Sequence, residues 1–379
     1  MTERLALQSI PLARPNLSGL ERELVHQVLS SDTLSMGPFT DRFERMLAEM
    51  VGRRHGIAVS SGTAGLHLVV RALGFGAGDE VITTPFSFVA SANCLVYEGA
   101  VPRFVDIEED TLGLDPDLVS MAVTDRTVGI LTVDVFGKPS RLTELGAIAT
   151  DRGWPLIEDS CEALGTSLNG RPLGSFGAAS VFAFYPNKQI TTGEGGMIVT
   201  DDDGLAATMR SARNQGRDED GTWLRHVQLG FNYRLDEVSA ALGVGQLERY
   251  EELREGRRRV VEAYERLLAD IDWLRLPAQA PGSDVDWFVY VAQVAEGVDR
   301  DAMIDALARQ GVPARPYFSP LHLQPLYRER FGYRAGEFPV TERIAARTLA
   351  LPYSSRHSAI EVERVADALH AAAVEQGVA

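Results

Sequence analysis

Lys188 is the residue whose type and setting best suit covalent chemistry. Lys stands at only two of the 37 basic positions, Lys138 and Lys188, and Arg fills the other 35. Arg serves surface charge as well as Lys does, but only Lys can lose its proton and attack a carbonyl to form a Schiff base. Lys188 lies in FAFYPNKQITTGEGG, residues 182–196, between an aromatic-rich strand and a glycine turn, where α/β proteins place their chemistry. We expect Lys188 to be the nucleophile and Lys138 to be a loop residue that Arg could replace.

A second segment carries groups that suit a phosphate. Residues 60–68, SSGTAGLHL, lead from an expected strand into an expected helix. Backbone amides at the start of a helix lack intrahelical acceptors and favour anions. Taken alone this signal is weak, because a Ser or Thr before a helix is more often just an N-cap. The candidate anion-binding residues are Ser61, Gly62, Thr63 and Ala64.

A third segment, IEDSCEALG at residues 157–165, ends an apolar strand in acidic residues. A buried carboxylate is costly unless it meets a cation or strong donors, so an ion pair with Arg is one explanation. The other is a pyridinium nitrogen, because an ionised Asp keeps the ring of pyridoxal 5′-phosphate protonated and electron-withdrawing. Asp159 is the residue we assign to this role.

The elements that must position these residues follow from the hydrophobic pattern of residues 55–200. Short β-rich runs alternate with longer amphipathic stretches, which is typical of a layered α/β domain. Helices are expected between the strands, for example over 63–74 and 142–153. The seven expected strands are 55–60, 80–84, 102–106, 128–134, 155–159, 179–185 and 195–200.

The remaining chain predicts a second, smaller unit. Ser18 and Glu21 have capping-box spacing before an N-terminal helix. One helical pattern runs over 237–268, and RRR at 257–259 is expected to lie on its solvated face. A strand, a helix and a final helix are expected within 287–294, 299–311 and 360–376. We predict a large α/β domain over residues 1–250, with an N-terminal arm, and a small α+β domain over residues 251–379.

Composition excludes several classes of protein. The formal net charge is −16, which argues against binding to nucleic acid or to an anionic membrane. No apolar run is long enough to span a bilayer or to form a signal peptide. Cys94 and Cys161 cannot form a disulfide framework or a Cys/His metal site, so we expect no metal and a reducing, cytoplasmic location.

The motifs SSGT, PFSF, EDS and YPNK, in this order, resemble those of the fold type I pyridoxal 5′-phosphate enzymes. More closely, the chain resembles the DegT/DnrJ/EryC1/StrS family of sugar aminotransferases. The resemblance covers nearly the whole chain, from SMGPFTDRFE at 35–44, through LGFNYRLDEVSAALGVGQLERY, to RPYFSPLHLQPLY. It implies a mostly parallel seven-stranded sheet flanked by helices, with a smaller α+β C-terminal domain.

The resemblance also implies roles for individual residues. Lys188 would form the Schiff base with pyridoxal 5′-phosphate and move protons, and Asp159 would pair with the pyridine nitrogen. Phe88 would stack on the ring, and the Thr63 and Ala64 amides, beside Gly62, would bind its phosphate.

Further roles involve a second copy and the substrate. Family members share active sites across a homodimer, and in this chain Asn232, rather than Arg234, is our choice for the residue that reaches the partner's cofactor phosphate. Tyr317 and His322 match a segment that faces the sugar nucleotide, although packing within the small domain explains them equally well.

Two positions depart from the family pattern. Glu162 stands where many relatives have a Gln that donates to the cofactor's phenolic oxygen, so we expect Glu162 to be protonated or turned aside. Ala183 stands where many have a phosphate-binding Ser, so phosphate binding would depend more on residues 61–64 and on the partner chain. Neither change removes a step of the chemistry.

The expected function is transfer of an amino group from glutamate or glutamine to the 3-keto or 4-keto group of a nucleotide-linked deoxysugar. A cyclitol aminotransferase acting on a keto-inositol is an open alternative, and a cofactor-binding regulatory protein is a weaker one. The dehydratase branch of the family carries His in place of the lysine, and Lys188 disfavours it. Substrate identity is expected to depend on loops such as residues 213–230.

Overall fold

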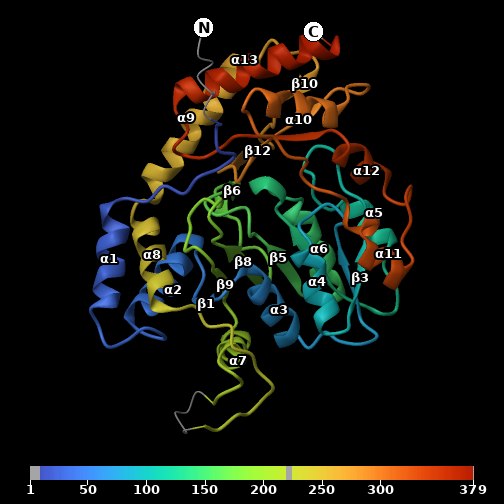
Figure 1. Ribbon diagram of the computed structural model, residues 1–379. Coiled ribbons are helices and arrows are strands. Elements are labelled where there is room, and N and C mark those ends of the chain that lie inside the picture. Colours follow the sequence, from blue (N-terminus) through green and yellow to red (C-terminus); the bar gives the residue numbers. More distant parts are fainter. Residues whose placement is uncertain (1–8, 219–223, 379) are drawn as a thin grey trace.

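The computed structural model describes residues 9–218 and 224–378 of the 379-residue chain (Figure 1). Its centre is a seven-stranded sheet in the order β1-β9-β8-β5-β4-β2-β3. The five strands from β8 to β3 run parallel, and β9 is antiparallel to both of its neighbours. The strands are β1 (His55–Val59), β2 (Glu80–Thr83), β3 (Val101–Phe104), β4 (Thr127–Val133), β5 (Leu156–Asp159), β8 (Ala179–Ala183) and β9 (Gly196–Thr200). The predicted mostly parallel α/β sheet is confirmed, and each strand begins and ends within two residues of its expected bounds.

Both faces of this sheet are covered by helices, which explains why its strands are mostly apolar on both faces. Ile198 of β9 packs in one core and its neighbours Met197 and Val199 pack in another, because side chains alternate along a strand. The first core is shared with α3 (Gly62–Ala72), α4 (Ala90–Tyr97) and α7 (Asp203–Arg213). The second is shared with α1 (Gly19–Leu29), α2 (Pro38–Val51) and α8 (Glu237–Glu248). A further small core lies beneath α5 (Pro116–Met121) and α6 (Leu142–Arg152).

The C-terminal part has its own antiparallel sheet, in the order β10-β12-β13. Its strands and helices share one hydrophobic core, at the top of the molecule in Figure 1. They are α9 (Tyr250–Leu268), β10 (Leu274–Arg275), β12 (Tyr290–Val294), α10 (Arg300–Arg309), β13 (Thr348–Leu351) and α13 (Ala359–Gln376). Short elements complete the fold: η1 (Val135–Gly137), β6 (Ser167–Leu168), β7 (Arg171–Pro172), β11 (Ser283–Asp284), η2 (Leu321–Leu323), α11 (Pro325–Phe331) and α12 (Pro339–Ala345).

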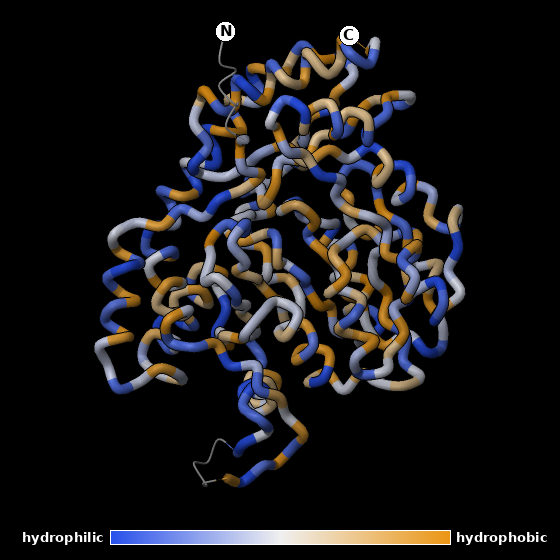
Figure 2. The backbone as a smooth tube through the Cα atoms, in the orientation of Figure 1, coloured by the Kyte–Doolittle hydropathy of each residue, from blue (hydrophilic) through white to orange (hydrophobic). Residues whose placement is uncertain are grey.

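The N-terminal helix is confirmed. Ser18 and Glu21 form both hydrogen bonds of the capping box at the start of α1. Hydrophobic and hydrophilic stretches alternate along its turns (Figure 2), and Leu24 and Val28 are buried against the rest of the protein. Among the described residues, no helix is both long enough and apolar enough to cross a bilayer.

One expectation for residues 237–268 is wrong, and another holds only in part, because Arg258 and Arg259 are exposed but Arg257 is not. The single helical pattern is divided into α8 and α9 at Arg249, whose backbone is not helical (φ −107°, ψ 13°). The Arg249 guanidinium donates to Glu21 at 2.6 Å, which fastens the end of α8 to α1. Arg257, expected on a solvated face, is buried and donates to Asp286 at 2.8 Å and to the carbonyl of Gln189 at 2.7 Å. Periodicity shows that a stretch is helical, but these distant partners decide where it bends and which Arg is enclosed.

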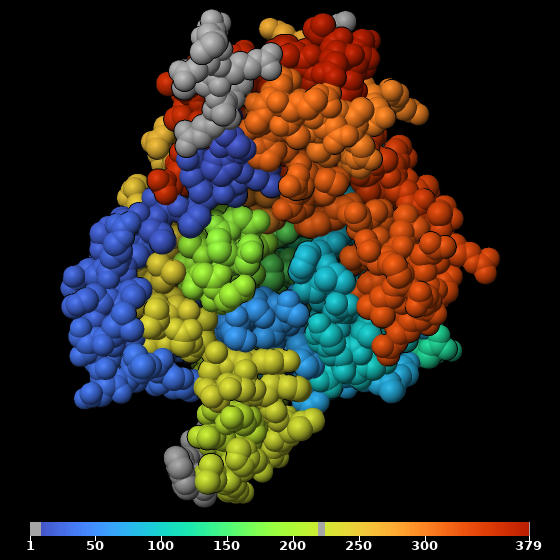
Figure 3. All heavy atoms as spheres, in the orientation of Figure 1, coloured from blue at the N-terminus to red at the C-terminus, as the bar shows by residue number. Residues whose placement is uncertain are grey.

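The loop after α7 projects from the body of the molecule (Figures 1 and 3). This loop belongs to residues 213–230, which we expect to influence substrate choice; residues 219–223 within it lie outside the described part of the chain.

Candidate active site

Lys188 lies in the turn that follows β8. Its backbone N–H donates to the carbonyl of Tyr185 at 2.9 Å. The Nζ atom lies 3.5 Å from Glu162 Oε1 and 3.7 Å from the centre of the Phe288 ring. Only 13% of the side chain is exposed. The amine is therefore fixed near the ends of the strands, between a carboxylate and the face of an aromatic ring.

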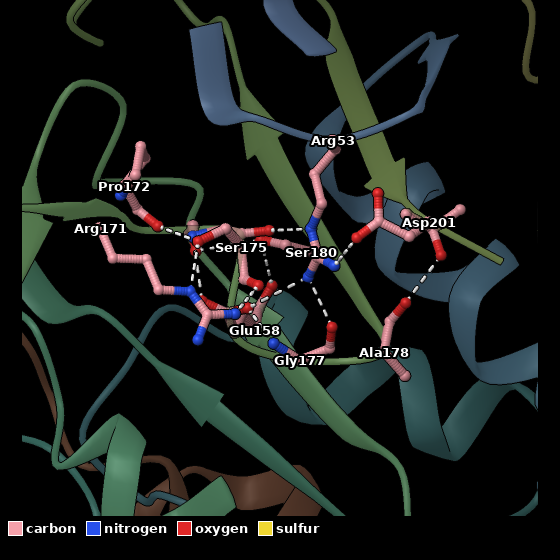
Figure 4. A network of polar contacts seen from close by, with 12 residues as sticks. Arg53, Glu158, Arg171, Pro172, Ser175, Gly177, Ala178, Ser180 and Asp201 are labelled. Atoms are coloured by element: carbon pink, nitrogen blue, oxygen red, sulfur yellow. Dashed lines mark hydrogen bonds and ion pairs between the residues drawn. The ribbon is translucent and has the colours of Figure 1, made fainter. Parts of the chain in front are cut away.

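The last two residues of β5 direct their carboxylates to opposite faces of the sheet, because side chains alternate along a strand. Glu158 lies 3.8 Å from the Arg53 guanidinium and accepts hydrogen bonds from the N–H groups of Gly174 and Gly177 (Figure 4). Burial raises the pKa of Glu158 in spite of these donors. An ion pair with Arg is one explanation for the acidic residues of this strand, and it is Glu158 that forms it. Asp159 lies on the other face of the sheet.

Asp159 is held by two hydrogen-bond donors. Its Oδ2 accepts from the Ser91 hydroxyl at 2.6 Å, and its Oδ1 accepts from the Cys161 N–H at 3.2 Å. No ion pair among the described residues includes Asp159. The carboxylate therefore remains available to a cation that enters from outside the chain.

The start of α3 offers free backbone amides. The Ser61 hydroxyl accepts from the N–H of Ala64 at 3.1 Å, so Ser61 is an N-cap and the Ala64 amide is engaged. The N–H groups of Gly62 and Thr63 lie in the first turn and have no intrahelical acceptor. A Cβ atom at Gly62 would approach Ala183 Cβ to 2.8 Å, which requires glycine at this close contact. Of the three expected donors, Gly62 and Thr63 are therefore the two that remain free for an anion.

These groups surround one cavity of about 430 Å³. Most of the predicted site residues line it: Gly62, Thr63, Phe88, Asp159, Glu162, Lys188 and Tyr317. The size is in the range of small-molecule sites, roughly 300–1,000 Å³. Within the described residues, no group of three or more His, Cys, Asp and Glu side chains is placed to hold a metal ion.

Glu162 is not turned aside from the cavity. Its Oε2 accepts from the Phe136 N–H at 2.8 Å while Oε1 faces Lys188. Burial raises the pKa of Glu162, and the charge of Lys188 opposes this rise. The same carboxylate, together with burial, raises the pKa of the Tyr317 hydroxyl.

Three predicted residues lie outside the lining of this cavity. Ala64 is the first, and its amide is engaged by the Ser61 hydroxyl. Asn232 is exposed, in a segment that runs beside Asn214. His322 is fully buried, with Nε2 2.9 Å from Glu342 and its ring against Phe338. The structure thus places Asn232 where another chain could meet it and His322 within packing of the C-terminal part.

Sequence reasoning missed several residues of the site. Phe288 covers Lys188 although it lies in a different part of the chain, and no local pattern indicates that contact. Ser91 was not predicted, because it lies in the mostly apolar segment that forms α4. A hydroxyl on the buried side of that helix is a signal that could have indicated a polar partner in the interior. Tyr185, Phe318 and Glu194 also line the cavity.

The residues present fit pyridoxal 5′-phosphate. The cavity combines the amine of Lys188, the carboxylate of Asp159, which has no cationic partner, and free amides at the start of α3. The ring of Phe88, which is 59% exposed, lies beside them. In addition, the buried Oδ1 atom of Asn187 on the cavity wall has no hydrogen-bond partner among the described residues.

Comparison with known proteins gives consistent matches over the whole length. The sequence model of the DegT/DnrJ/EryC1/StrS aminotransferase family matches residues 15–370. GDP-perosamine synthase of Caulobacter vibrioides is 37% identical over 368 residues, which cover 96% of this chain and 98% of that protein. The aminotransferase TlmJ from Streptoalloteichus hindustanus aligns with a TM-score of 0.90 and 32% identity, over 97% of this chain and 99% of the other. DesI, solved in the presence of its TDP-sugar product, aligns with a TM-score of 0.90 and 35% identity, over 98% of this chain and 94% of the other.

Proposed function

Because the chain belongs to the DegT/DnrJ/EryC1/StrS aminotransferase family and is a sugar aminotransferase, we propose that it transfers an amino group to the keto carbon of a nucleotide-linked deoxysugar. Members of this family depend on pyridoxal 5′-phosphate, and we propose that this chain binds the same cofactor. The observation that carries the proposal is the position of Lys188 Nζ, which lies in one cavity with the carboxylate of Asp159 and the free amides of α3.

Each residue has a distinct task in this proposal. When bound, pyridoxal 5′-phosphate supplies an aldehyde that accepts amino groups and a ring that withdraws electrons. Lys188 would hold the aldehyde carbon through its amine, and as a free amine it would move a proton between the substrate carbon and that aldehyde carbon. Asp159 would hold a proton on the ring nitrogen. Gly62 and Thr63 would bind the phosphate, and Phe88 would pack on the ring.

The surroundings of Lys188 keep it in place for proton transfer. Glu162 is 3.5 Å away on one side and the Phe288 ring is 3.7 Å away on another, so the flexible side chain has little room to move. A proton-transfer group is effective only when it is held within hydrogen-bond reach of the reacting atom.

The proposed substrate is a nucleotide sugar, with glutamate or glutamine as amino donor. Two similar proteins are named for such compounds, GDP-perosamine synthase and DesI with its TDP-sugar product. Tyr185 is exposed at the cavity and would receive the sugar or base, and Tyr317 provides a hydroxyl there. Product masses from parallel incubations with keto-sugar nucleotides and with a keto-inositol would separate this substrate from the cyclitol alternative.

We further propose that two copies of the chain complete each site, with Asn232 of one copy reaching the cofactor phosphate bound by the other.

Residues 1–250 and 251–379 would form the two domains, and Phe288 would bring the second domain over Lys188 of the first. The enzyme would act in the cytoplasm, where reduced Cys94 and Cys161 are stable.

A borohydride experiment tests the assignment of Lys188. Protein supplied with pyridoxal 5′-phosphate should be yellow, and borohydride should bleach the colour and leave the cofactor on the peptide that contains Lys188. Lys188→Ala should lose the label and at least about a thousandfold in amino transfer. Lys138→Met is the matched control, because it removes the only other lysine and should keep the label. Protein that takes up no cofactor, or a label on Lys138, would contradict the proposal.

A further inference from the structure

A chain of two hydroxyl groups leads from the cavity wall to Asp159. Ser87 lines the cavity, and its Oγ lies 2.7 Å from Ser91 Oγ. Ser91 Oγ lies 2.6 Å from Asp159 Oδ2. All three side chains are buried, and Ser91 is fully enclosed. The contacts are therefore made in an environment where solvent cannot replace a missing hydrogen bond.

The direction of both hydrogen bonds follows from the number of protons available. A serine hydroxyl has one proton, and an ionised carboxylate can only accept. Ser91 therefore donates its proton to Asp159, and its oxygen is left to accept the proton of Ser87. Successive hydroxyl groups aligned in this way polarise one another and direct their positive ends toward the carboxylate.

Asp159 needs these donors more than a surface carboxylate would. It is buried, and its neighbours include the acidic side chain of Glu162, which repels a second negative charge. The donors that it does have are the Ser91 hydroxyl and the Cys161 N–H. Hydrogen bonds to the charged form of a buried acid stabilise that form.

The position of Ser91 is fixed by its helix. Ser91 lies in the first turn of α4, and its N–H donates to the Phe88 carbonyl at 3.3 Å. The same short segment thus carries Ser87, Phe88 and Ser91. The ring that would contact the cofactor and the hydroxyl that holds Asp159 are therefore fixed relative to each other.

We propose that Ser91, with Ser87 behind it, is a positioning residue that holds the Asp159 carboxylate in the orientation in which it meets the cofactor ring. This inference rests on the proposed function, because it concerns how Asp159 holds pyridoxal 5′-phosphate. Ser91 contacts neither cofactor nor substrate in this proposal and acts only through Asp159.

The test compares three Ser→Ala variants by titration with pyridoxal 5′-phosphate. Ser91→Ala should raise the dissociation constant about tenfold or more, because a hydrogen bond to a charged buried group is lost. Ser87→Ala should raise it by a smaller factor, since Ser87 acts through Ser91. Ser180→Ala is the control: Ser180 is equally buried and donates to the Glu158 carbonyl at 3.0 Å, but it does not contact the Asp159 carboxylate. Its dissociation constant should stay within about twofold of wild type.

Two further measurements separate positioning from general stability. Thermal unfolding without cofactor should show that Ser91→Ala and Ser180→Ala remain folded with similar midpoints. With saturating cofactor, Ser91→Ala should lower kcat while the KM for the sugar stays unchanged. Equal cofactor affinities for wild type and Ser91→Ala, or an equal loss in Ser180→Ala, would overturn the inference. A wild-type protein that binds no cofactor would instead overturn the proposed function itself.

Discussion

The two lysines of this chain differ in what surrounds the ammonium group. Lys188 faces the carboxylate of Glu162, whereas Lys138 forms no ion pair among the described residues and donates to the backbone carbonyl of Asp110. Lys138 lies in a loop, as expected, but only 8% of it is exposed. Burial, together with the charge of Arg275, lowers the pKa of Lys138 from 10.5 to about 8. Lys138 also lines a cavity of about 220 Å³, and the expectation that Arg could replace it stays a prediction.

This lowered pKa predicts a dependence of stability on pH. Between pH 8 and pH 10.5 the unfolded chain keeps the Lys138 proton and the folded chain has lost it, so the free energy of unfolding rises with pH. Between about pH 7 and pH 9.5 the contribution is about 2 kcal/mol. Wild type should therefore gain about that much relative to Lys138→Met between these two pH values in urea unfolding. If the difference in free energy of unfolding between wild type and Lys138→Met did not change with pH, the lowered pKa of Lys138 would be contradicted.

At the scale of elements, Glu237 joins two helices that are distant in sequence. It is the first residue of α8 and is buried, and its carboxylate accepts from the N–H groups of Gly37, Phe39 and Thr40 at 3.0, 2.9 and 2.9 Å. These amides begin α2, whose own N-cap, Gly37, has no side chain to accept them. A carboxylate at a helix N-terminus also interacts favourably with the helix dipole. One side chain thus caps a helix that begins 199 residues earlier in the chain.

Removal of this carboxylate should destabilise the protein. Glu237→Ala should lower the free energy of unfolding by about 2–4 kcal/mol, because buried amides lose a charged acceptor. Glu248→Ala is the control in the same helix, since its carboxylate pairs with Arg42 near the surface and such pairs contribute about 0–1 kcal/mol. Chemical denaturation of both variants measures the difference. Equal losses would show that the cap is not what holds α2 in place.

At the scale of the whole molecule, exposed apolar side chains gather on the projecting segment. Leu224, Val227 and Leu229 are exposed there, and Leu229 is 69% exposed. Phe88 and Tyr185, at the cavity, are also exposed. Clusters of exposed apolar residues mark interaction surfaces more often than single ones do. The proposed second copy would cover Leu224, Val227 and Leu229 and bring its Asn232 to the site.

The dimer can be tested through this segment. Wild type should have about twice the 41.3 kDa mass of one chain in light scattering after size exclusion, and Leu229→Glu should shift the protein toward the mass of one chain. Loss of the partner should also weaken cofactor binding, because Asn232 arrives from the other copy. Ile360→Glu is the control, since Ile360 is 70% exposed but lies on α13, away from the cavity. A wild-type protein with the mass of one chain would contradict the shared site.

The sequence alone predicted the strands of the central sheet and the two residues to which the proposed function assigns the chemistry. Short apolar, β-rich runs between helical patterns located all seven strands of the central sheet, because strands covered on both faces are apolar along their length. The scarcity of lysine singled out Lys188, and the acidic end of an apolar strand singled out Asp159. Both lie in one cavity, because the carboxyl ends of parallel strands meet at one edge of the sheet.

Only the tertiary structure decided which groups surround these two residues. Phe288 reaches Lys188 across 100 residues of sequence, and Ser91 reaches Asp159 across 68. The enclosure of Lys138, the cap that Glu237 supplies to α2 and the break at Arg249 depend in the same way on segments that meet only when the chain folds. Local periodicity carries no information about such long-range contacts, because they depend on how the helices and sheets pack together and not on the sequence of any one element.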